Sequence, residues 1–231
     1  MAKDIKDIWN SFMCSGAEFS DSDIPFCPTT ATAPPHSIIT WSEAKAIYHK
    51  NVKNGNPDFK HDAFVCFYEN DYKFDSTRGI WHGCKFVLKV LRHFAGAITP
   101  DFSTYQDFPD PLKRYNTFRM RTFGFWLGKN GVAVINNVRW GTEETWCYCY
   151  DGLPDNSMLC IGTVGGSPRK ITDRSRFEEG LYELVRRKKP HTILVYGSAD
   201  YPCFDKLRKM GISIIPYPSK TALAFERRRA V

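Results

Sequence analysis

The sequence predicts an α/β protein in which six mostly parallel strands alternate with helices, in a barrel-like or an open sheet. Short runs rich in apolar and β-branched residues recur at residues 64–68, 94–98, 132–136, 159–163, 192–197 and 212–217. Segments with helical apolar spacing lie between them, at residues 84–93, 111–128, 176–189 and 204–211. This alternation is typical of βαβ units, which form parallel sheets. Barrel closure depends on strand tilt and shear, and the irregular loops after the second and third strands favour a barrel-like sheet.

Each predicted strand is a short apolar run that ends at turn-forming residues. FVCFY (residues 64–68) and FAGAI (94–98) are the first two, and LCIGT, TILVYG and ISIIPY are the last three. The third, VAVIN (132–136), begins with four apolar residues, so we expect it to be buried on both faces. It is followed at once by Asn137, Arg139 and Trp140, which are unusual residues for a plain turn.

The predicted helices have one apolar face each. In the helix over 84–93 this face holds Phe86, Val87, Val90 and Leu91, and in the helix over 111–128 we expect Leu112, Tyr115, Phe118 and Thr122 to face inward. The helix over 204–211 ends at a glycine, which favours helix termination. The basic tail ERRRAV is expected to fray.

Residues 1–55 are expected to form an irregular N-terminal extension and linker, and residues 56–231 the α/β domain. DIKDIWNSF fits a short amphipathic helix, and SDSDIPFCPTTATAPPHS is rich in proline, threonine and serine. Ser42 is expected to cap a helix that runs through His49.

The charge balance favours an anionic partner. Lysine and arginine outnumber aspartate and glutamate by 32 to 25, a formal net charge of +7. This excess is typical of proteins that bind nucleic acid, nucleotides or acidic proteins, although it also serves solubility. No apolar run approaches the roughly 18 residues of a membrane span, and the N-terminus MAKDIKDIWNSF is charged throughout. We therefore expect a cytoplasmic protein with no membrane partner.

The cysteines do not predict a metal site. The chain has eight of them, and a cytoplasmic location predicts free thiols. Cys147 and Cys149 lie in WCYCY without the CxxC spacing of a zinc site, and an apolar strand of period two explains them better.

The candidate site lies at the carboxyl ends of the strands, because ligands of parallel α/β proteins bind there. Every strand-end loop carries polar or charged residues, many of which are ordinary turn formers. Asp101 after the second strand, and Arg139 and Trp140 after the third, stand out because arginine and tryptophan are poor turn formers. We expect these three side chains to share one cavity.

The leading hypothesis is a phosphate-bearing ligand, either nucleic acid or a nucleotide. Arg139 would hold a phosphate, Trp140 would stack on a base and Asn137 would lie beside them. After the fourth strand, TVGGSPRK contributes Gly165, Gly166, Ser167 and Arg169, which suit close backbone approach to a phosphate. The chain lacks the P-loop and the GxGxxG fingerprint.

Two alternatives remain open at this stage. In the first, Asp101 acts with Glu143 or Glu144 in a nuclease or glycosidase, which brings in Mg²⁺ as a cofactor. In the second, the chain has no small-molecule site and inhibits a host enzyme through surface contacts.

Five motifs together carry a resemblance to a known family. ITPDFSTY, YNTFRMRTFGFWL, GVAVINNVRWG, CIGTVGG and ILVYGS, in this order, resemble a domain-of-unknown-function family, number forty-four seventeen, found in bacteria and their phages. The resemblance covers roughly residues 60–220 and leaves out the first 55 or so. It implies a phage or mobile-element origin, and hence a role in replication or in countering host defence inside the host cytoplasm. The positions that match the family are Asp101, Asn137, Arg139, Trp140, Gly162, Tyr196 and Gly197.

Overall fold

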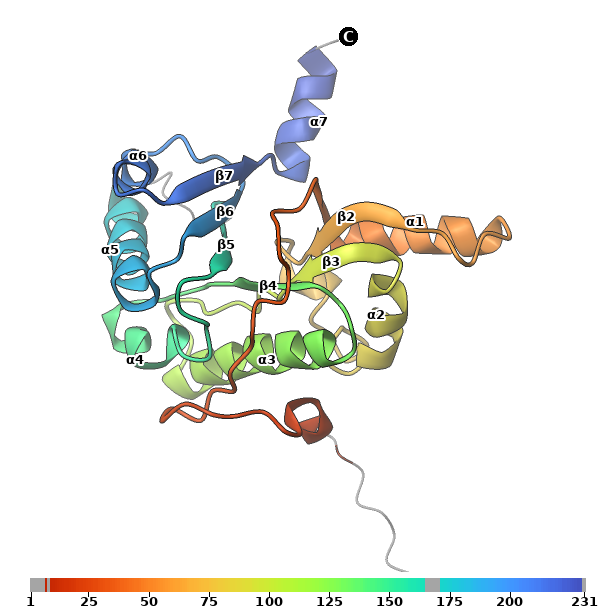
Figure 1. The fold of residues 1–231 in the computed structure, drawn as a ribbon, viewed down its shortest axis with the longest axis horizontal. Helices are drawn as coiled ribbons and strands as arrows, with labels where there is room; N and C mark the ends of the chain where they lie inside the picture. The colour runs from red at the N-terminus through yellow and green to blue at the C-terminus, as the bar shows by residue number, and fades with distance from the viewer. Residues whose placement is uncertain (1–6, 8, 165–170, 230–231) are drawn as a thin grey trace, which may run out of the picture.

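The computed structural model describes residue 7 and residues 9–164 and 171–229. Its centre is one parallel sheet of seven strands, whose order in space follows their order in the chain (Figure 1). The strands are β1 (Ile38–Thr40), β2 (His61–Cys66), β3 (Phe94–Ile98), β4 (Val134–Asn137), β5 (Met158–Gly162), β6 (Thr192–Tyr196) and β7 (Ser213–Tyr217). The predicted α/β class and all six predicted strands are confirmed. The prediction missed β1, because three residues are too few to show a period.

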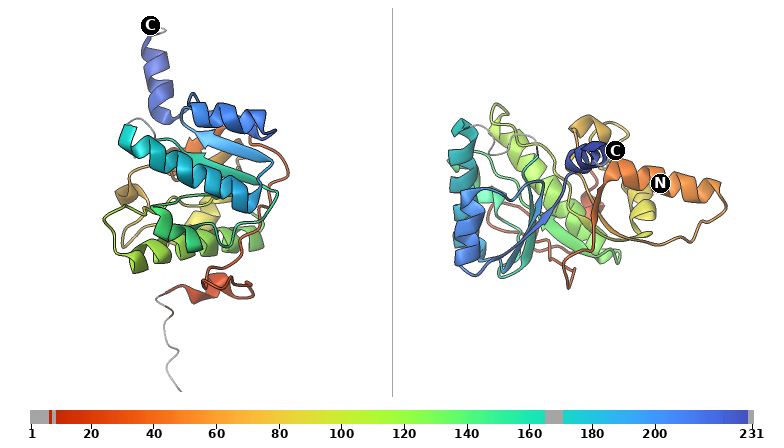
Figure 2. Two further views of the ribbon diagram at one scale, coloured as in Figure 1. Left: turned by 90° about the vertical axis from the view of Figure 1, so that its left-hand side faces the viewer. Right: turned by 90° about the horizontal axis from the view of Figure 1, so that it is seen from above.

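The sheet curls into a half-barrel, with helices against its outer face (Figure 2). The helices are α1 (Trp41–Lys53), α2 (Cys84–Leu91), α3 (Asp110–Lys129), α4 (Trp146–Cys149), α5 (Ile171–Lys188), α6 (Pro202–Lys209) and α7 (Lys220–Arg229). Three 3₁₀ helices accompany them: η1 (Ser11–Cys14), η2 (Asp71–Lys73) and η3 (Glu143–Thr145). Helix α7 stands out from the rest of the molecule (Figure 1).

Alternate residues of the strands face opposite sides of the sheet, because the side-chain period of a strand is two. Val65 of β2 packs with α1, α2 and α3 in one core, and Val195 of β6 packs with α4, α5 and α6 in a second. A third core fills the concave face and includes Phe64, Ile135 and Leu194. Burial on both faces explains why these strands are continuous apolar runs.

Residues 24–37, here called the strap, fill a gap in the sheet (Figure 1). β4 and β5 pair only at Asn136↔Leu159 and Asn137↔Cys160, so the first half of β4 has no neighbour on that side. There the backbone N–H of Thr30 donates to the carbonyl of Val134 (2.9 Å), and the Thr29 hydroxyl donates to the carbonyl of Met158 (3.2 Å). The strap thus bridges the two strands.

Several local predictions are wrong. Helix α1 is capped by Thr40 and not by Ser42, since Thr40 and Glu43 form a reciprocal capping box. WCYC forms the short helix α4 instead of a strand, because a short apolar run does not distinguish the two periods. The tail expected to fray is helical as far as Arg229.

The inward face of α3 also differs from the prediction. Thr122 is buried and Phe118 packs against the core as predicted, whereas Leu112 and Tyr115 are exposed, as is Phe86 of α2. The buried face of α3 carries Arg119 and Arg121 together with apolar residues, so a pattern of apolar spacing alone places the face wrongly.

Arg121 is the most deeply buried charge of α3, with no exposed surface. Its guanidinium donates to three backbone carbonyls: those of Asp151 (3.1 Å), Asn137 (3.0 Å) and Cys149 (3.1 Å). Burial lowers the pKa of Arg121 to about 10, which still leaves it charged at neutral pH. Arg121 therefore ties α3 to the end of β4 and to the loop after α4.

We predict that Arg121→Met lowers the free energy of unfolding by about 3–5 kcal/mol, because it leaves buried carbonyls without donors. Urea denaturation followed by circular dichroism measures this loss. The control is Arg208→Met, which removes an exposed ion pair to Asp205 and should cost less than about 0.5 kcal/mol. A loss below about 1 kcal/mol for Arg121→Met would contradict the structural role given to Arg121.

Candidate functional site

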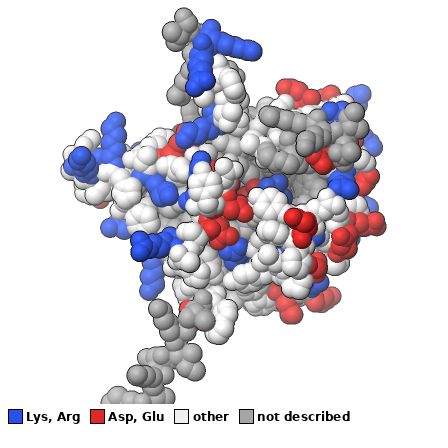
Figure 3. Space-filling view, turned by 180° about the vertical axis from the view of Figure 1, so that it is seen from behind, with Lys and Arg blue, Asp and Glu red and all other residues white. Residues whose placement is uncertain are grey.

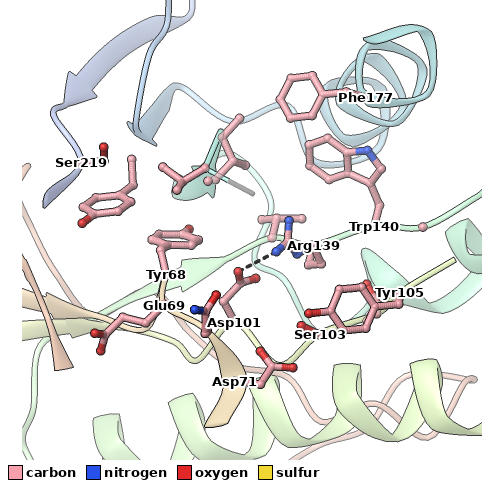
Figure 4. Close-up of a pocket in the computed structure, with 18 of the residues that line it drawn as sticks. Tyr68, Glu69, Asp71, Asp101, Ser103, Tyr105, Arg139, Trp140, Phe177 and Ser219 are labelled. Carbon is pink, nitrogen blue, oxygen red and sulfur yellow. Dashed lines mark hydrogen bonds and ion pairs between the residues drawn. The ribbon is translucent and has the colours of Figure 1, made fainter. Parts of the chain in front are cut away.

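A pocket of about 690 Å³ opens at the carboxyl ends of the strands (Figure 4). Side chains from most of the strand-end loops reach it, as expected for a curled parallel sheet. The wall includes Tyr68, Glu69, Asp71, Asp101, Ser103, Tyr105, Arg139, Trp140, Ile161, Gly162, Arg176, Phe177, Tyr196 and Lys220.

The centre of the pocket is an ion pair between two loops. Arg139 donates from Nη2 to Oδ2 of Asp101 at 2.8 Å (dashed in Figure 4). Asp101 is buried, while the Arg139 side chain keeps 28% of its surface exposed. The other carboxylate oxygen, Oδ1, accepts a bond of 3.0 Å from the side-chain amide of Asn137. Both carboxylate oxygens of Asp101 are therefore hydrogen-bonded, and Asp101 holds the Arg139 guanidinium at the pocket.

Asn137 lies beneath this ion pair and is fully buried. Its Oδ1 accepts from the Tyr68 hydroxyl at 2.7 Å, and its Nδ2 also donates to the carbonyl of Pro100 at 3.2 Å. Burial raises the pKa of Tyr68 well above its usual value, so its hydroxyl stays a donor at neutral pH. The Asn137 side chain is therefore hydrogen-bonded on both of its polar atoms, and it joins the ends of β2, β3 and β4.

Two tyrosines form one side of the pocket. The rings of Tyr68 and Tyr196 stack with their centroids 5.1 Å apart and their planes 14° apart. Gly162 makes this possible, because a Cβ there would lie 2.7 Å from Cδ1 of Tyr68. The hydroxyl of Tyr196 accepts from the backbone N–H of Lys220 at 3.1 Å, which holds the start of α7 at the pocket.

Trp140 and Phe177 form an aromatic wall across the pocket from the tyrosines (Figure 4). Their ring centroids lie 5.3 Å apart, with the planes at 42°. The indole packs against α5 at Gly180, where a Cβ would come within 2.1 Å of the Trp140 ring. A glycine at this helical position thus admits the indole.

The acidic groups of the pocket differ in their environments. Oε1 of Glu69 accepts from the backbone N–H of Ser42 at 2.9 Å, at the start of α1. Burial raises the pKa of the Asp71 carboxyl, and the nearby carboxylates of Asp101 and Asp75 raise it further, against a hydrogen bond from Ser103. Asp71 has no ion pair with any described residue.

Cationic side chains surround the pocket mouth. Nζ of Lys73 lies 3.7 Å from Oε2 of Glu69, and Nζ of Lys220 lies 3.6 Å from Oε1 of Glu43 in α1. Arg176 of α5 donates to the side-chain oxygen of Gln106 at 2.5 Å, across the loop after β3.

The structure brings some of the predicted site residues together and not others. Asp101, Arg139 and Trp140 share the pocket wall as expected, and Asn137 supports Asp101 from below. Glu143 and Glu144 are exposed and do not line the pocket; Glu144 accepts from the Thr142 hydroxyl instead. Gly165, Gly166, Ser167 and Arg169 lie outside the described residues.

Several residues of the pocket wall are not among the predicted site residues. Tyr68, Asp71 and Tyr196 lie at or after strand ends, so the same strand-end rule points to them. Phe177 and Arg176 lie within α5, and no strand-end signal marks them.

The described residues contain neither a cluster of potential metal ligands nor a helix that could span a membrane. No group of three or more His, Cys, Asp or Glu residues there could hold a metal ion. None of the described helices is both long and apolar enough to cross a membrane. All eight cysteines are free thiols.

We predict that Asp71→Asn raises the melting temperature at pH 7 and has little effect near pH 3. A pKa raised by folding means that the folded state favours the protonated acid, so stability is lost as pH rises from the unfolded value of about 3.9 through the folded value. Asparagine cannot ionise and removes this loss. Differential scanning calorimetry at the two pH values measures the effect.

The matched control for this measurement is Asp21→Asn, at an exposed position, which should leave the melting temperature nearly unchanged at both pH values. An equal change for Asp71→Asn at pH 3 and pH 7, or a lower melting temperature at pH 7, would contradict the environment inferred for Asp71.

The chain is similar in sequence to two phage proteins. It is 32% identical over 174 residues to the Gene 1 protein of Mycobacterium phage D29, an alignment that covers 75% of this chain and 59% of the relative. It is 31% identical over 138 residues to the Gene 1 protein of Mycobacterium phage L5, which covers 60% of this chain and 58% of the relative. The chain thus spans less than two thirds of the length of these relatives. No solved structure matches it.

The family match confirms the resemblance carried by the five motifs and extends it towards the N-terminus. It begins at residue 19, so the strap and β1 lie within it, although the first 55 or so residues were expected to lie outside. Over residues 19–218 the chain belongs to the family described as Domain of unknown function (DUF4417).

Proposed function

We propose that the pocket binds a phosphate-bearing ligand of the nucleotide type. The observation that carries this proposal is the Arg139 guanidinium, held by Asp101 and partly exposed to the pocket beside the Trp140–Phe177 wall. Only Nη2 of Arg139 bonds to Asp101, and no described residue accepts from Nε or Nη1. These N–H groups are suited to a phosphate oxygen.

The rest of the pocket favours a nucleotide over a bare phosphate. Its volume of about 690 Å³ lies within the range of small-molecule sites, roughly 300–1,000 Å³. The aromatic wall offers an apolar surface to a base. Asp71, which has no ion pair with any described residue, supplies an acceptor for ribose hydroxyls or exocyclic amines, which an inorganic anion lacks.

The relatives support a phage setting for this activity. Both are phage proteins, so we propose that the chain acts in the host cytoplasm as a phage or mobile-element protein, in replication or counter-defence. A nucleotide ligand fits either role.

We predict that Arg139→Gln weakens nucleotide binding by about 1–3 kcal/mol, because a charge-assisted bond to phosphate is lost. Isothermal titration calorimetry with a panel of ribo- and deoxyribonucleoside mono- and triphosphates measures the change. Arg208→Gln, on the exposed surface of α6, serves as the control. Unchanged affinity of Arg139→Gln across every ligand that the parent chain binds would remove the proposal.

The contribution of the base is tested separately with Trp140→Leu. We predict that this variant binds nucleotides about 1–3 kcal/mol more weakly and binds pyrophosphate as the parent chain does. The control is Trp9→Leu, since Trp9 is 66% exposed and remote from the pocket wall. Equal losses for nucleotides and pyrophosphate would show that Trp140 acts on the fold of the pocket and not on the base.

A hydrolase is the second candidate, and the contrast between Asp71 and Asp101 favours it. Asp101 pairs with Arg139, whereas the pKa of Asp71 is raised by burial. Two carboxyl groups in such different environments suit an acid and a base. Mg²⁺-dependent turnover of nucleotides or oligonucleotides that is lost in Asp101→Asn would favour this candidate over binding alone.

A further inference from the structure

The molecule carries a face of one charge sign beside the pocket. Figure 3 shows lysine and arginine gathered on the side of α1 and on α7, while aspartate and glutamate gather on the opposite half. Helices α1 and α2 together hold five lysines and one glutamate. We define the basic face by its exposed residues Lys50, Lys53, Lys85, Lys89, Arg92 and Arg228.

None of these six cations forms an ion pair with a carboxylate of the described residues. The basic end of α5 differs, because Arg186 and Arg187 pair with Glu183, and Lys188 pairs with Asp155. The charge of the basic face is therefore available to an external anion, whereas that of α5 is largely neutralised.

Aromatic rings lie among these cations. Phe86 of α2 is 42% exposed, and the His49 ring stacks on it with centroids 6.0 Å apart. Phe225 of α7 is 60% exposed. A groove or face that mixes cations with exposed rings is typical of sites for unpaired nucleic-acid strands, whose phosphates meet the cations while the bases stack.

Two of the helices that carry the basic face, α1 and α7, begin at the pocket. Thr40 caps α1 and also lines the pocket, and Lys220 is both the first residue of α7 and part of the pocket wall. Since α1 has 13 residues, it leads about 20 Å away from the pocket. A chain molecule held in the pocket by one end would pass over these helices.

We propose that the partner is a single-stranded nucleic acid, whose phosphates lie along the basic face while one of its nucleotides occupies the pocket. This inference rests on the proposed function of the pocket and adds the polymer and the surface that holds it. An unpaired strand is required, because only an unstacked nucleotide can enter a pocket of this size.

The test uses the full chain with Lys50, Lys53, Lys85 and Lys89 all replaced by glutamate. Fluorescence anisotropy measures its affinity for a labelled 12-nucleotide single strand over a series of salt concentrations, and calorimetry measures its affinity for a mononucleotide. We expect at least a tenfold loss for the strand and a salt slope smaller by about 3, from roughly 0.7 per phosphate contact. Mononucleotide affinity should stay within about twofold of the parent chain, which also shows that the variant is folded.

The matched control replaces Lys189, Lys206, Arg208 and Lys209 with glutamate, which changes the net charge equally on the other side of the molecule. Its affinity for the strand should fall much less than that of the basic-face variant. Equal losses in the two variants, or no loss in either, would overturn the inference.

The remaining outcomes separate the inference from the proposed function. If Arg139→Gln loses the mononucleotide and the basic-face variant keeps the strand, the pocket proposal stands and the inference fails. If no mononucleotide binds to the parent chain, the pocket proposal fails and the inference fails with it. Tighter binding to duplex than to the single strand, or binding only to vesicles of anionic phospholipid, would also overturn the inference.

Discussion

The pocket depends on one buried amide, the side chain of Asn137 at the end of β4. An amide buried without water must satisfy both its oxygen and its nitrogen. Here the oxygen accepts from the Tyr68 hydroxyl, and the nitrogen donates to the carboxylate of Asp101, which in turn positions Arg139. The orientation of the guanidinium is thus set below the surface, and a ligand would meet a group that is already in place.

Arg121 extends this constraint to the outer layer of the fold. It donates to the backbone carbonyl of Asn137 from beneath, so the end of β4 is held from α3 as well as from its neighbouring strands. The two arginines therefore serve different purposes. One is enclosed by carbonyls and stabilises the frame, while the other, Arg139, lines the pocket and has one carboxylate partner among the described residues.

The sequence predicts the frame well, because buried parallel strands are apolar runs and their ends converge by topology. That reasoning places Asp101, Arg139 and Trp140 in one pocket. The same reasoning does not explain why Asn136 is buried. Its side-chain amide donates to the backbone carbonyl of Cys27 in the strap at 2.8 Å. A contact between positions more than one hundred residues apart has no local signal in the chain. Phe177 is missed for the same reason. It joins the pocket wall because α5 packs beside Trp140, and nothing in the neighbouring sequence indicates this contact.

The strap has a consequence for how the protein is made. It is synthesised before its hydrogen-bond partners Val134 and Met158, which follow it by more than one hundred residues. β1 to β4 can pair in order as they appear, but β4 and β5 cannot be joined along their full length until the strap returns to lie between them. Non-local closure of this kind is slow. The strap therefore lacks these partners until β5 has been synthesised, and only then can it close the sheet between β4 and β5.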